Sequence, residues 1–118
     1  MARILSISPS EVLRTTRQLV LERAGYQVRS VDNPAEDHSF TKEDKFDLAI
    51  IGHNFRGEDK RKIARVINKH FPGLPILELC FHSPEIPGAD FILSDSPDEL
   101  LTAIREILGG RRVRGFLQ

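Results

Sequence analysis

The segment Phe-Asp-Leu-Ala-Ile-Ile at residues 46–51 is nearly all apolar and is followed directly by Gly52. A short apolar run of this kind is typical of a strand buried on both faces, as strands in the middle of a parallel sheet are. The segment therefore predicts a central strand of a parallel sheet with helices packed above and below it.

The flanking segments alternate between strand and helix patterns. Further strands are predicted at residues 3–7, 26–31, 75–80 and 91–93, and helices at residues 11–24, 58–70 and 97–108. Residues 33–44 show little periodicity and predict only a short, irregular helix. Strands and helices that alternate with short connections imply a parallel sheet covered on both faces. The expected fold is an α/β domain with five strands.

Three predicted helix starts share one local pattern, in which a capping residue precedes a proline and an acid follows. The pattern occurs as Ser8-Pro9-Ser10-Glu11, Asn33-Pro34-Ala35-Glu36 and Ser96-Pro97-Asp98-Glu99. A proline suits the first helical position, and the acid completes a capping box with a Ser or Asn cap. Gly25 is expected to end the first helix.

Helical periodicity assigns a core-facing side to each helix. In the first helix this side holds Val12, Leu13, Thr16, Leu19 and Val20. In the second it holds Ile63, Val66, Ile67 and His70.

Composition limits the classes of function. Lys and Arg number 17 and Asp and Glu number 17, so the 118-residue chain has no net charge. This balance argues against nucleic-acid binding, because the phosphate backbone attracts positively charged proteins. No apolar run is long enough to span a membrane, the N-terminus lacks a signal-peptide pattern, and a single cysteine excludes an internal disulfide. We expect a single cytoplasmic domain.

Four segments in this order resemble the receiver domain of two-component response regulators. They are Ala-Gly-Tyr-Gln-Val at 24–28, Phe-Asp-Leu-Ala-Ile-Ile at 46–51, Leu-Pro-Ile-Leu at 74–77 and Gly-Ala-Asp at 88–90. The resemblance implies a three-layer, flavodoxin-like (βα)5 fold, also called CheY-like, with strand order 2-1-3-4-5. It covers residues 2–108, which predicts a receiver-like domain at residues 1–109 followed by a basic tail at 110–118.

The family's phosphoacceptor site is expected to be degenerate in this chain. The resemblance implies two acids that hold Mg²⁺, an aspartate that accepts the phosphoryl group, and a hydroxyl and a lysine that contact it. These positions fall on Ser8 and Pro9, on Gly52, on Cys80 and on Asp95. None of them supplies the chemistry required. We therefore expect no catalytic residue, metal or cofactor, and a non-enzymatic pseudo-receiver.

The family's fourth helix is also expected to be shortened or lost. Only residues 81–87 separate Cys80 from Gly88, and Pro84 and Pro87 lie among them. Two prolines in so short a stretch oppose helix formation. In the family, this helix borders the face used for signalling and dimerisation, so that face is expected to be rebuilt or exposed.

The resemblance implies a function through protein–protein contact. The expected partner is a signalling protein, such as a histidine kinase or another regulator, or a second copy of the chain; neither nucleic acid nor membrane is expected. Candidate partner-binding residues are the basic helix positions Lys62, Arg65 and Lys69, and Phe116 and Leu117 in the tail. A solvated helix face and a frayed terminus are the plainer alternatives.

An alternative of another class uses polar residues at the ends of neighbouring strands. His53, Cys80, His82 and Asp95 are zinc-ligand types, and a cysteine with a histidine can form a nucleophile pair. This set predicts a small ligand-binding or metal-binding α/β protein or a thiol enzyme. The plainer interpretation is a buried structural cysteine with solvated histidines.

Overall fold

The computed structural model describes residues 1–34, 40 and 44–115, and its centre is a parallel sheet of six strands in the order β2-β1-β3-β4-β5-β6. The strands are β1 (Arg3–Ile7), β2 (Gln27–Val31), β3 (Leu48–Ile51), β4 (Ile76–Leu79), β5 (Asp90–Ile92) and β6 (Arg114–Gly115). The helices are α1 (Glu11–Arg23), α2 (Gly57–His70) and α3 (Pro97–Leu108). The predicted α/β fold and the order of its first five strands are confirmed.

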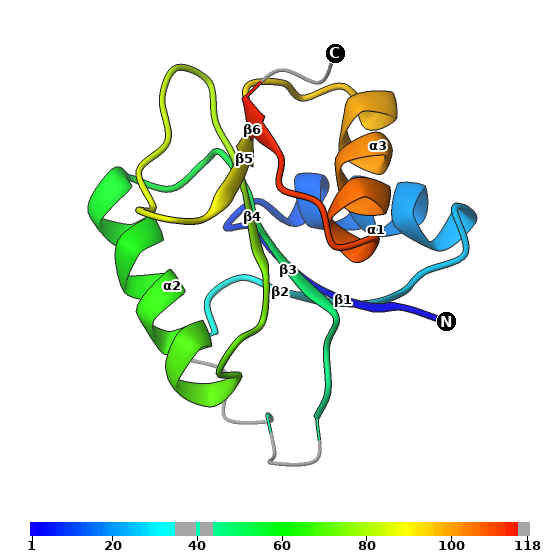
Figure 1. The fold of residues 1–118 in the computed structure, drawn as a ribbon, viewed down its shortest axis with the longest axis horizontal. Helices are drawn as coiled ribbons and strands as arrows, with labels where there is room; N and C mark the ends of the chain where they lie inside the picture. Colours follow the sequence, from blue (N-terminus) through cyan, green and yellow to red (C-terminus); the bar gives the residue numbers. More distant parts are fainter. Residues whose placement is uncertain (35–39, 41–43, 116–118) are drawn as a thin grey trace.

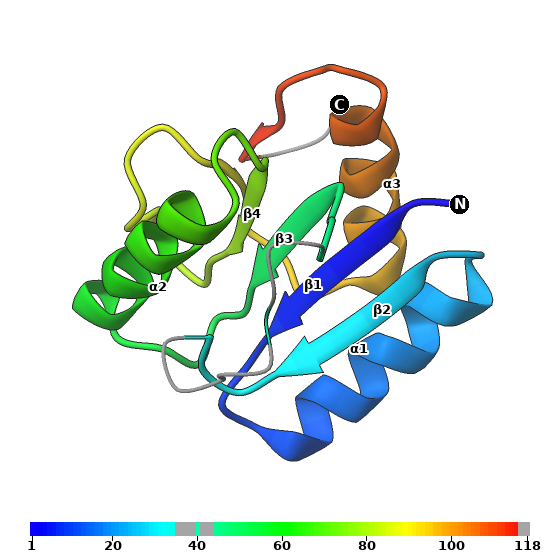
Figure 2. The same cartoon turned by 90° about the horizontal axis from the view of Figure 1, so that it is seen from below.

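The sheet lies between two helical layers, with α1 and α3 on one face and α2 on the other (Figures 1 and 2). The central strand β3 is buried along its whole length, as its sequence predicts. Leu48 and Ile50 pack in the core on the α1 and α3 side, whereas Ala49 and Ile51 pack in the core on the α2 side. Alternate residues of one strand thus supply both cores, which explains the unbroken apolar run.

The sixth strand corrects the five-stranded expectation. It comes from the segment that the sequence assigned to a basic tail. Gly110 adopts a positive φ of 86°, and β6 then pairs in parallel with the outer edge of β5. Phe91 N–H donates to the Val113 carbonyl over 3.0 Å, and Val113 is buried. An open edge of β5 gains a partner strand in this way. Phe116 and Leu117 lie outside the described residues.

The core-facing side predicted for α1 is wrong for Val12, Thr16 and Leu19, whereas Leu13 and Val20 are half-buried. Val12 and Leu19 were expected inside, but they are 74% and 52% exposed. Leu21 and Arg17 are the buried residues of this helix. The prediction failed because it kept a charged arginine out of the core. In α2, Lys60 is buried although it was not predicted inside, which is the same error. His70 is the opposite error, because it was predicted inside and is exposed.

The local signals at the helix ends were mostly read correctly. Ser96 caps α3 as predicted, and its Oγ accepts from Glu99 N–H. In α1 the cap is Ser10 rather than Ser8, with Ser10 Oγ accepting from Leu13 N–H. Gly25 follows α1 with a φ of 97°. The irregular helix expected in residues 33–44 falls largely on residues outside the described ranges.

No helix forms between β4 and β5, where residues 80–89 are all described. The predicted loss of the family's fourth helix is confirmed. The connecting loop instead runs along the α2 side of the sheet, where Ile86 is buried in the core. Among the residues that the structure covers, no helix has the length and apolar character needed to cross a lipid bilayer.

Candidate functional site

The carboxyl ends of β1, β3, β4 and β5 meet at one edge of the sheet, where open α/β folds bind their ligands. The residues that follow these strands there include all five positions that the sequence resemblance implies for the phosphoacceptor pocket, namely Ser8, Pro9, Gly52, Cys80 and Asp95. The structure therefore places these predicted positions at the same edge of the sheet.

Ser8 and Pro9 present no metal ligand. Ser8 is buried, and its hydrogen bonds lie within the protein: its N–H donates to the Val31 carbonyl and its carbonyl accepts from Arg14 Nη1 at 2.8 Å. Its Oγ accepts from Ser10 N–H. Pro9 is exposed and offers no side-chain donor atom. Ser8 thus serves the turn that leads into α1.

Gly52 lies where the family places its acceptor aspartate, and the space beside it is filled. A Cβ at this position would lie 3.1 Å from Arg17 Nη1 and 3.3 Å from the Ile7 carbonyl oxygen. Gly52 N–H donates to that same carbonyl over 2.9 Å. A guanidinium from α1 therefore occupies the region in which an acceptor side chain would begin.

Arg17 is a buried cation. Its side chain comes from the middle of α1, and the residue is 8% exposed. Nη1 has no hydrogen-bond partner among the described residues. Burial lowers the pKa of Arg17. Burying an unpaired charge is unfavourable, so this residue carries a cost that no carboxylate among the described residues offsets.

A cavity of about 160 Å³ lies beside Arg17, between α1 and α3. Its wall is mostly apolar, with a few polar groups. The lining residues are Leu13, Thr16, Arg17, Val20, His53, Leu79, Ser94, Asp95, Pro97 and Leu100. A cavity of this size holds a molecule comparable to benzene.

His53 follows Gly52 and closes part of this cavity. Its ring stacks on Phe81, with centroids 4.4 Å apart and an interplanar angle of 15°. Burial, followed by the charge of Arg17, lowers the pKa of His53, although a hydrogen bond with the Ser94 backbone and the charge of Asp95 oppose this. Nε2 has no hydrogen-bond partner among the described residues. The imidazole is therefore neutral near pH 7.

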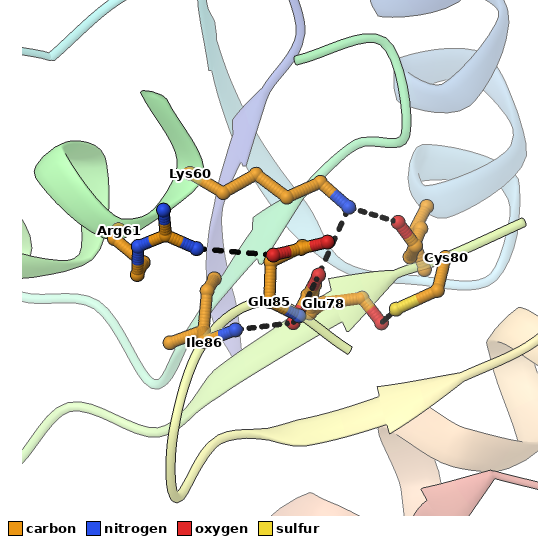
Figure 3. A network of polar contacts seen from close by, with 7 residues as sticks. Lys60, Arg61, Glu78, Cys80, Glu85 and Ile86 are labelled. Atoms are coloured by element: carbon orange, nitrogen blue, oxygen red, sulfur yellow. Dashed lines mark hydrogen bonds and ion pairs between the residues drawn. The ribbon is translucent and has the colours of Figure 1, made fainter. Parts of the chain in front are cut away.

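A second buried cation, Lys60, lies on the α2 side of the same sheet. Its Nζ donates to Glu78 Oε2 and to the Leu79 carbonyl, each over 2.9 Å (Figure 3). Glu78 is fully buried in β4. This cation has a carboxylate partner, in contrast to Arg17.

Glu78 also anchors the loop that replaces the missing helix. Its carboxylate accepts hydrogen bonds from the backbone N–H groups of Glu85 and Ile86, each with an N···O distance of 3.0 Å (Figure 3). The Glu85 side chain pairs with Arg61 at 3.0 Å. Glu85 also fills the space beside Gly57, where an added Cβ would clash with it. The loop is thus fixed to both β4 and α2.

The metal or thiol site predicted from four strand-end residues is not formed in the described part of the chain. No group of three His, Cys, Asp or Glu residues there could hold a metal ion. Burial, followed by the charge of Glu78, raises the pKa of Cys80 to about 12, so its thiol is not an activated nucleophile. His82 is exposed in the loop. Of the four residues, only His53 and Asp95 line the same cavity.

The predicted basic face is present on α2. Lys62, Arg65 and Lys69 are all exposed. Their role in partner binding stays a prediction, as does that of Phe116 and Leu117, which lie outside the described residues.

Sequence reasoning missed three buried charged residues at this sheet edge: Arg17, Lys60 and Glu78. Glu78 carried a visible signal, because it interrupts the apolar run of a predicted strand. Arg17 also carried one, because it lies four residues from both Leu13 and Leu21 and so shares their helix face. Lys60 had no signal of its own, since its partner lies 18 residues away.

Comparison with protein-family models finds no match. Among curated proteins, the chain is similar to the transcriptional regulatory protein GltR of Pseudomonas aeruginosa, with 33% identity over 116 residues. The match covers 89% of this chain and 48% of the relative, so the chain spans about half the length of the curated relative it matches.

Solved structures of receiver domains share the fold. A response regulator from Thermotoga maritima matches with a TM-score of 0.76 at 24% identity, covering 92% of this chain and 98% of that one. The chemotaxis response regulator CheY4 of Vibrio cholerae matches with a TM-score of 0.73 at 24% identity, covering 91% of this chain and 98% of that one. The response regulator TrrA of Thermotoga maritima was solved in complex with Mg²⁺ and BeF. It matches with a TM-score of 0.73 at 23% identity, covering 91% of this chain and 99% of that one.

Proposed function

Because this chain has the CheY-like fold of response-regulator receiver domains, we propose that it is a pseudo-receiver. In this role it does not accept a phosphoryl group, catalyses no reaction, and works in two-component signalling by binding another protein. The observation that carries the proposal is the Arg17 guanidinium beside Gly52, 3.1 Å from where an acceptor's Cβ would begin.

The surrounding groups support this proposal. Phosphoryl transfer to a receiver needs carboxylates for Mg²⁺, a carboxylate nucleophile, and donors for the phosphoryl oxygens. Here Ser8 is engaged in backbone turns, Pro9 has no ligand atom, and Cys80 is buried. Asp95 adds a negative charge where the family has a positive one. A cation, Arg17, replaces the nucleophile.

Incubation with acetyl phosphate and Mg²⁺, followed by intact-mass measurement, tests the proposal. We expect no added mass. A stable gain of one phosphoryl group would overturn it. Gly52→Asp is the matched variant, and we expect no gain there either, because Arg17 would pair with the new carboxylate. A gain in this variant alone would show that the rest of the pocket still works and that one residue explains the loss.

Titration with Mg²⁺ gives an independent test. We expect the amide NMR spectrum to stay essentially unchanged. Specific, saturable shifts clustered at residues 8–10 and 52–54 would mean that a metal still binds, which contradicts the proposal.

The proposed partner is a cytoplasmic signalling protein, a histidine kinase or another regulator. Lys62, Arg65 and Lys69 offer an exposed basic face for an acidic partner. Crosslinking in the native host with mass-spectrometric identification tests this, with a variant carrying glutamate at all three positions. A kinase or regulator captured by the wild type and lost in the variant is expected. Equal capture by both would remove this face from the proposal.

A further inference from the structure

Arg17 points to a ligand because its buried charge has no carboxylate partner among the residues that the structure describes. Within the described residues, no ion pair joins Arg17 to a carboxylate and Nη1 lacks a hydrogen-bond partner. The residue is 92% buried, since 8% of it is exposed. Lys60 shows what the same sheet edge provides when a buried cation is structural, namely a carboxylate at 2.9 Å. A buried guanidinium without such a partner fits an external anion.

The cavity beside Arg17 defines the rest of the ligand. Its volume of about 160 Å³ is below that of ordinary ligand pockets and suits a small ligand better than a nucleotide or a sugar phosphate. Its wall is formed mainly by the apolar side chains of Leu13, Val20, Leu79, Pro97 and Leu100. A fully hydrated anion such as free phosphate would gain nothing from such a wall, whereas a short hydrocarbon chain would.

The charges around the cavity give the anion a direction. Arg17 lies buried inside, and Asp95 is exposed among the lining residues. Lys60 is neutralised by Glu78, and His53 is neutral near pH 7. Arg17 is therefore the net positive group, and the exposed carboxylate of Asp95 favours a ligand whose own anionic end points inward.

We propose that the cavity between α1 and α3 binds a small carboxylate with a short apolar chain. The guanidinium of Arg17 holds the carboxylate as a planar fork, and the chain packs against Leu79 and Leu100. The carboxylate could come from an aliphatic acid or from a small apolar amino acid, whose ammonium group would face Asp95. This inference goes beyond the proposed function and does not depend on the loss of phosphorylation.

The binding test follows the amide NMR spectrum of the full chain during titration with isovalerate. We expect saturable shifts at His53, Leu79, Ser94 and Leu100, with millimolar affinity or better. The neutral isostere isovaleramide should bind at least about tenfold more weakly, because it lacks the charge. Absence of saturable shifts up to about 50 mM, or equal binding of the amide, would overturn the inference.

Variants decide whether Arg17 is the receptor group. Arg17→Met should reduce the affinity for isovalerate at least about tenfold, since it removes the fork. Arg23→Met is the matched control, because Arg23 is exposed on the same helix, and it should leave the affinity unchanged. Arg17→Lys keeps the positive charge at this position, so it serves as a second variant in case Arg17→Met does not fold. It should bind isovalerate more weakly than the wild type, because it lacks the planar fork. Unchanged binding in Arg17→Met would overturn the inference.

Two further probes identify the source of the carboxylate. If valine binds more tightly than isovalerate, and Asp95→Asn removes the difference, the ligand class is an amino acid. If isovalerate binds more tightly, the class is an aliphatic acid. Inorganic phosphate that binds as tightly as isovalerate would contradict the role of the apolar wall. These outcomes are read from binding, so they are independent of the mass measurement that tests the proposed function.

Discussion

Two buried cations lie at the carboxyl edge of one sheet, on opposite faces, and they are treated differently by the fold. Lys60 meets a fully buried carboxylate, Glu78, and a backbone carbonyl. Arg17 is similarly buried, but its Nη1 has no partner among the described residues. A satisfied buried charge specifies local structure, whereas an unsatisfied one costs stability and is retained for another reason. The difference supports a structural role for Lys60 and the proposed ligand-binding role for Arg17.

The largest effect is expected from removing the carboxylate of the satisfied pair. Glu78→Ala leaves Lys60 buried without its partner and takes the acceptor from Glu85 N–H and Ile86 N–H. We expect the free energy of unfolding to fall by about 3–5 kcal/mol, measured by urea denaturation. Glu85→Ala is the control, because it removes only the partly exposed pair with Arg61 and should cost about 1 kcal/mol or less. Similar losses in both variants would contradict a structural role for Lys60 and Glu78.

On the α1 side of the sheet, we expect a substitution of the buried cation to stabilise the protein. Arg17→Met replaces a buried guanidinium with an apolar side chain of similar length, so the free energy of unfolding should rise by about 1–3 kcal/mol. Arg23→Met, on the exposed side of α1, should change it by less than about 0.5 kcal/mol. A destabilised Arg17→Met would mean that the guanidinium is structural, and the contrast with Lys60 would collapse.

A smaller loss of stability is expected at a further buried charge, Asp90. The Asp90 carboxylate is buried, and its Oδ1 accepts from Val113 N–H and from Arg112 Nε, both at 2.8 Å. Arg112 is itself largely exposed. Asp90→Asn keeps the shape but weakens these charge-assisted bonds, so we expect a loss of about 1–2 kcal/mol together with faster amide exchange in β6. Unchanged exchange at Arg114 and Gly115 would show that β6 is held by strand pairing alone.

The smallest expected effect is a pH dependence on the Arg17 side. Burial and the charge of Arg17 lower the pKa of His53, so the unfolded chain takes up a proton at this residue before the folded chain does. The stability from neutral His53 is complete above about pH 6.5, and it is lost as the pH falls from there through the lower folded pKa.

Between pH 7.5 and pH 5.5, the free energy of unfolding should therefore fall less in His53→Phe than in the wild type. The difference between the two proteins should be about 1 kcal/mol or less, and the stack on Phe81 is kept. Urea midpoints at several pH values measure this, with His82→Phe as the control for removing one histidine. NMR titration of the His53 ring sharpens the test, because Arg17→Met should raise its pKa. An unmoved ring pKa would show that Arg17 does not act on His53.

The sequence alone determined the central fold for reasons that are local. The apolar run at residues 46–51 is typical of a strand buried on both faces, and residues 48–51 form one. The cap at Ser96 begins a helix and the glycine at 25 follows the end of one, both through backbone chemistry. The absence of a carboxylate at position 52 was also visible, because it depends on residue identity. These signals need no knowledge of distant neighbours.

Tertiary structure decided the rest, because it depends on which distant groups meet. In α1, Arg17 is buried whereas Val12 and Leu19 are exposed, against the hydrophobic pattern. Lys60 found Glu78 across 18 residues, and β6 joined the edge of β5 from a segment that resembles a charged tail. The energy of a buried charge depends on the groups that it contacts, and the periodicity of the sequence does not predict those contacts. The cavity beside Arg17 is the product of that same long-range packing, and only the folded chain reveals it.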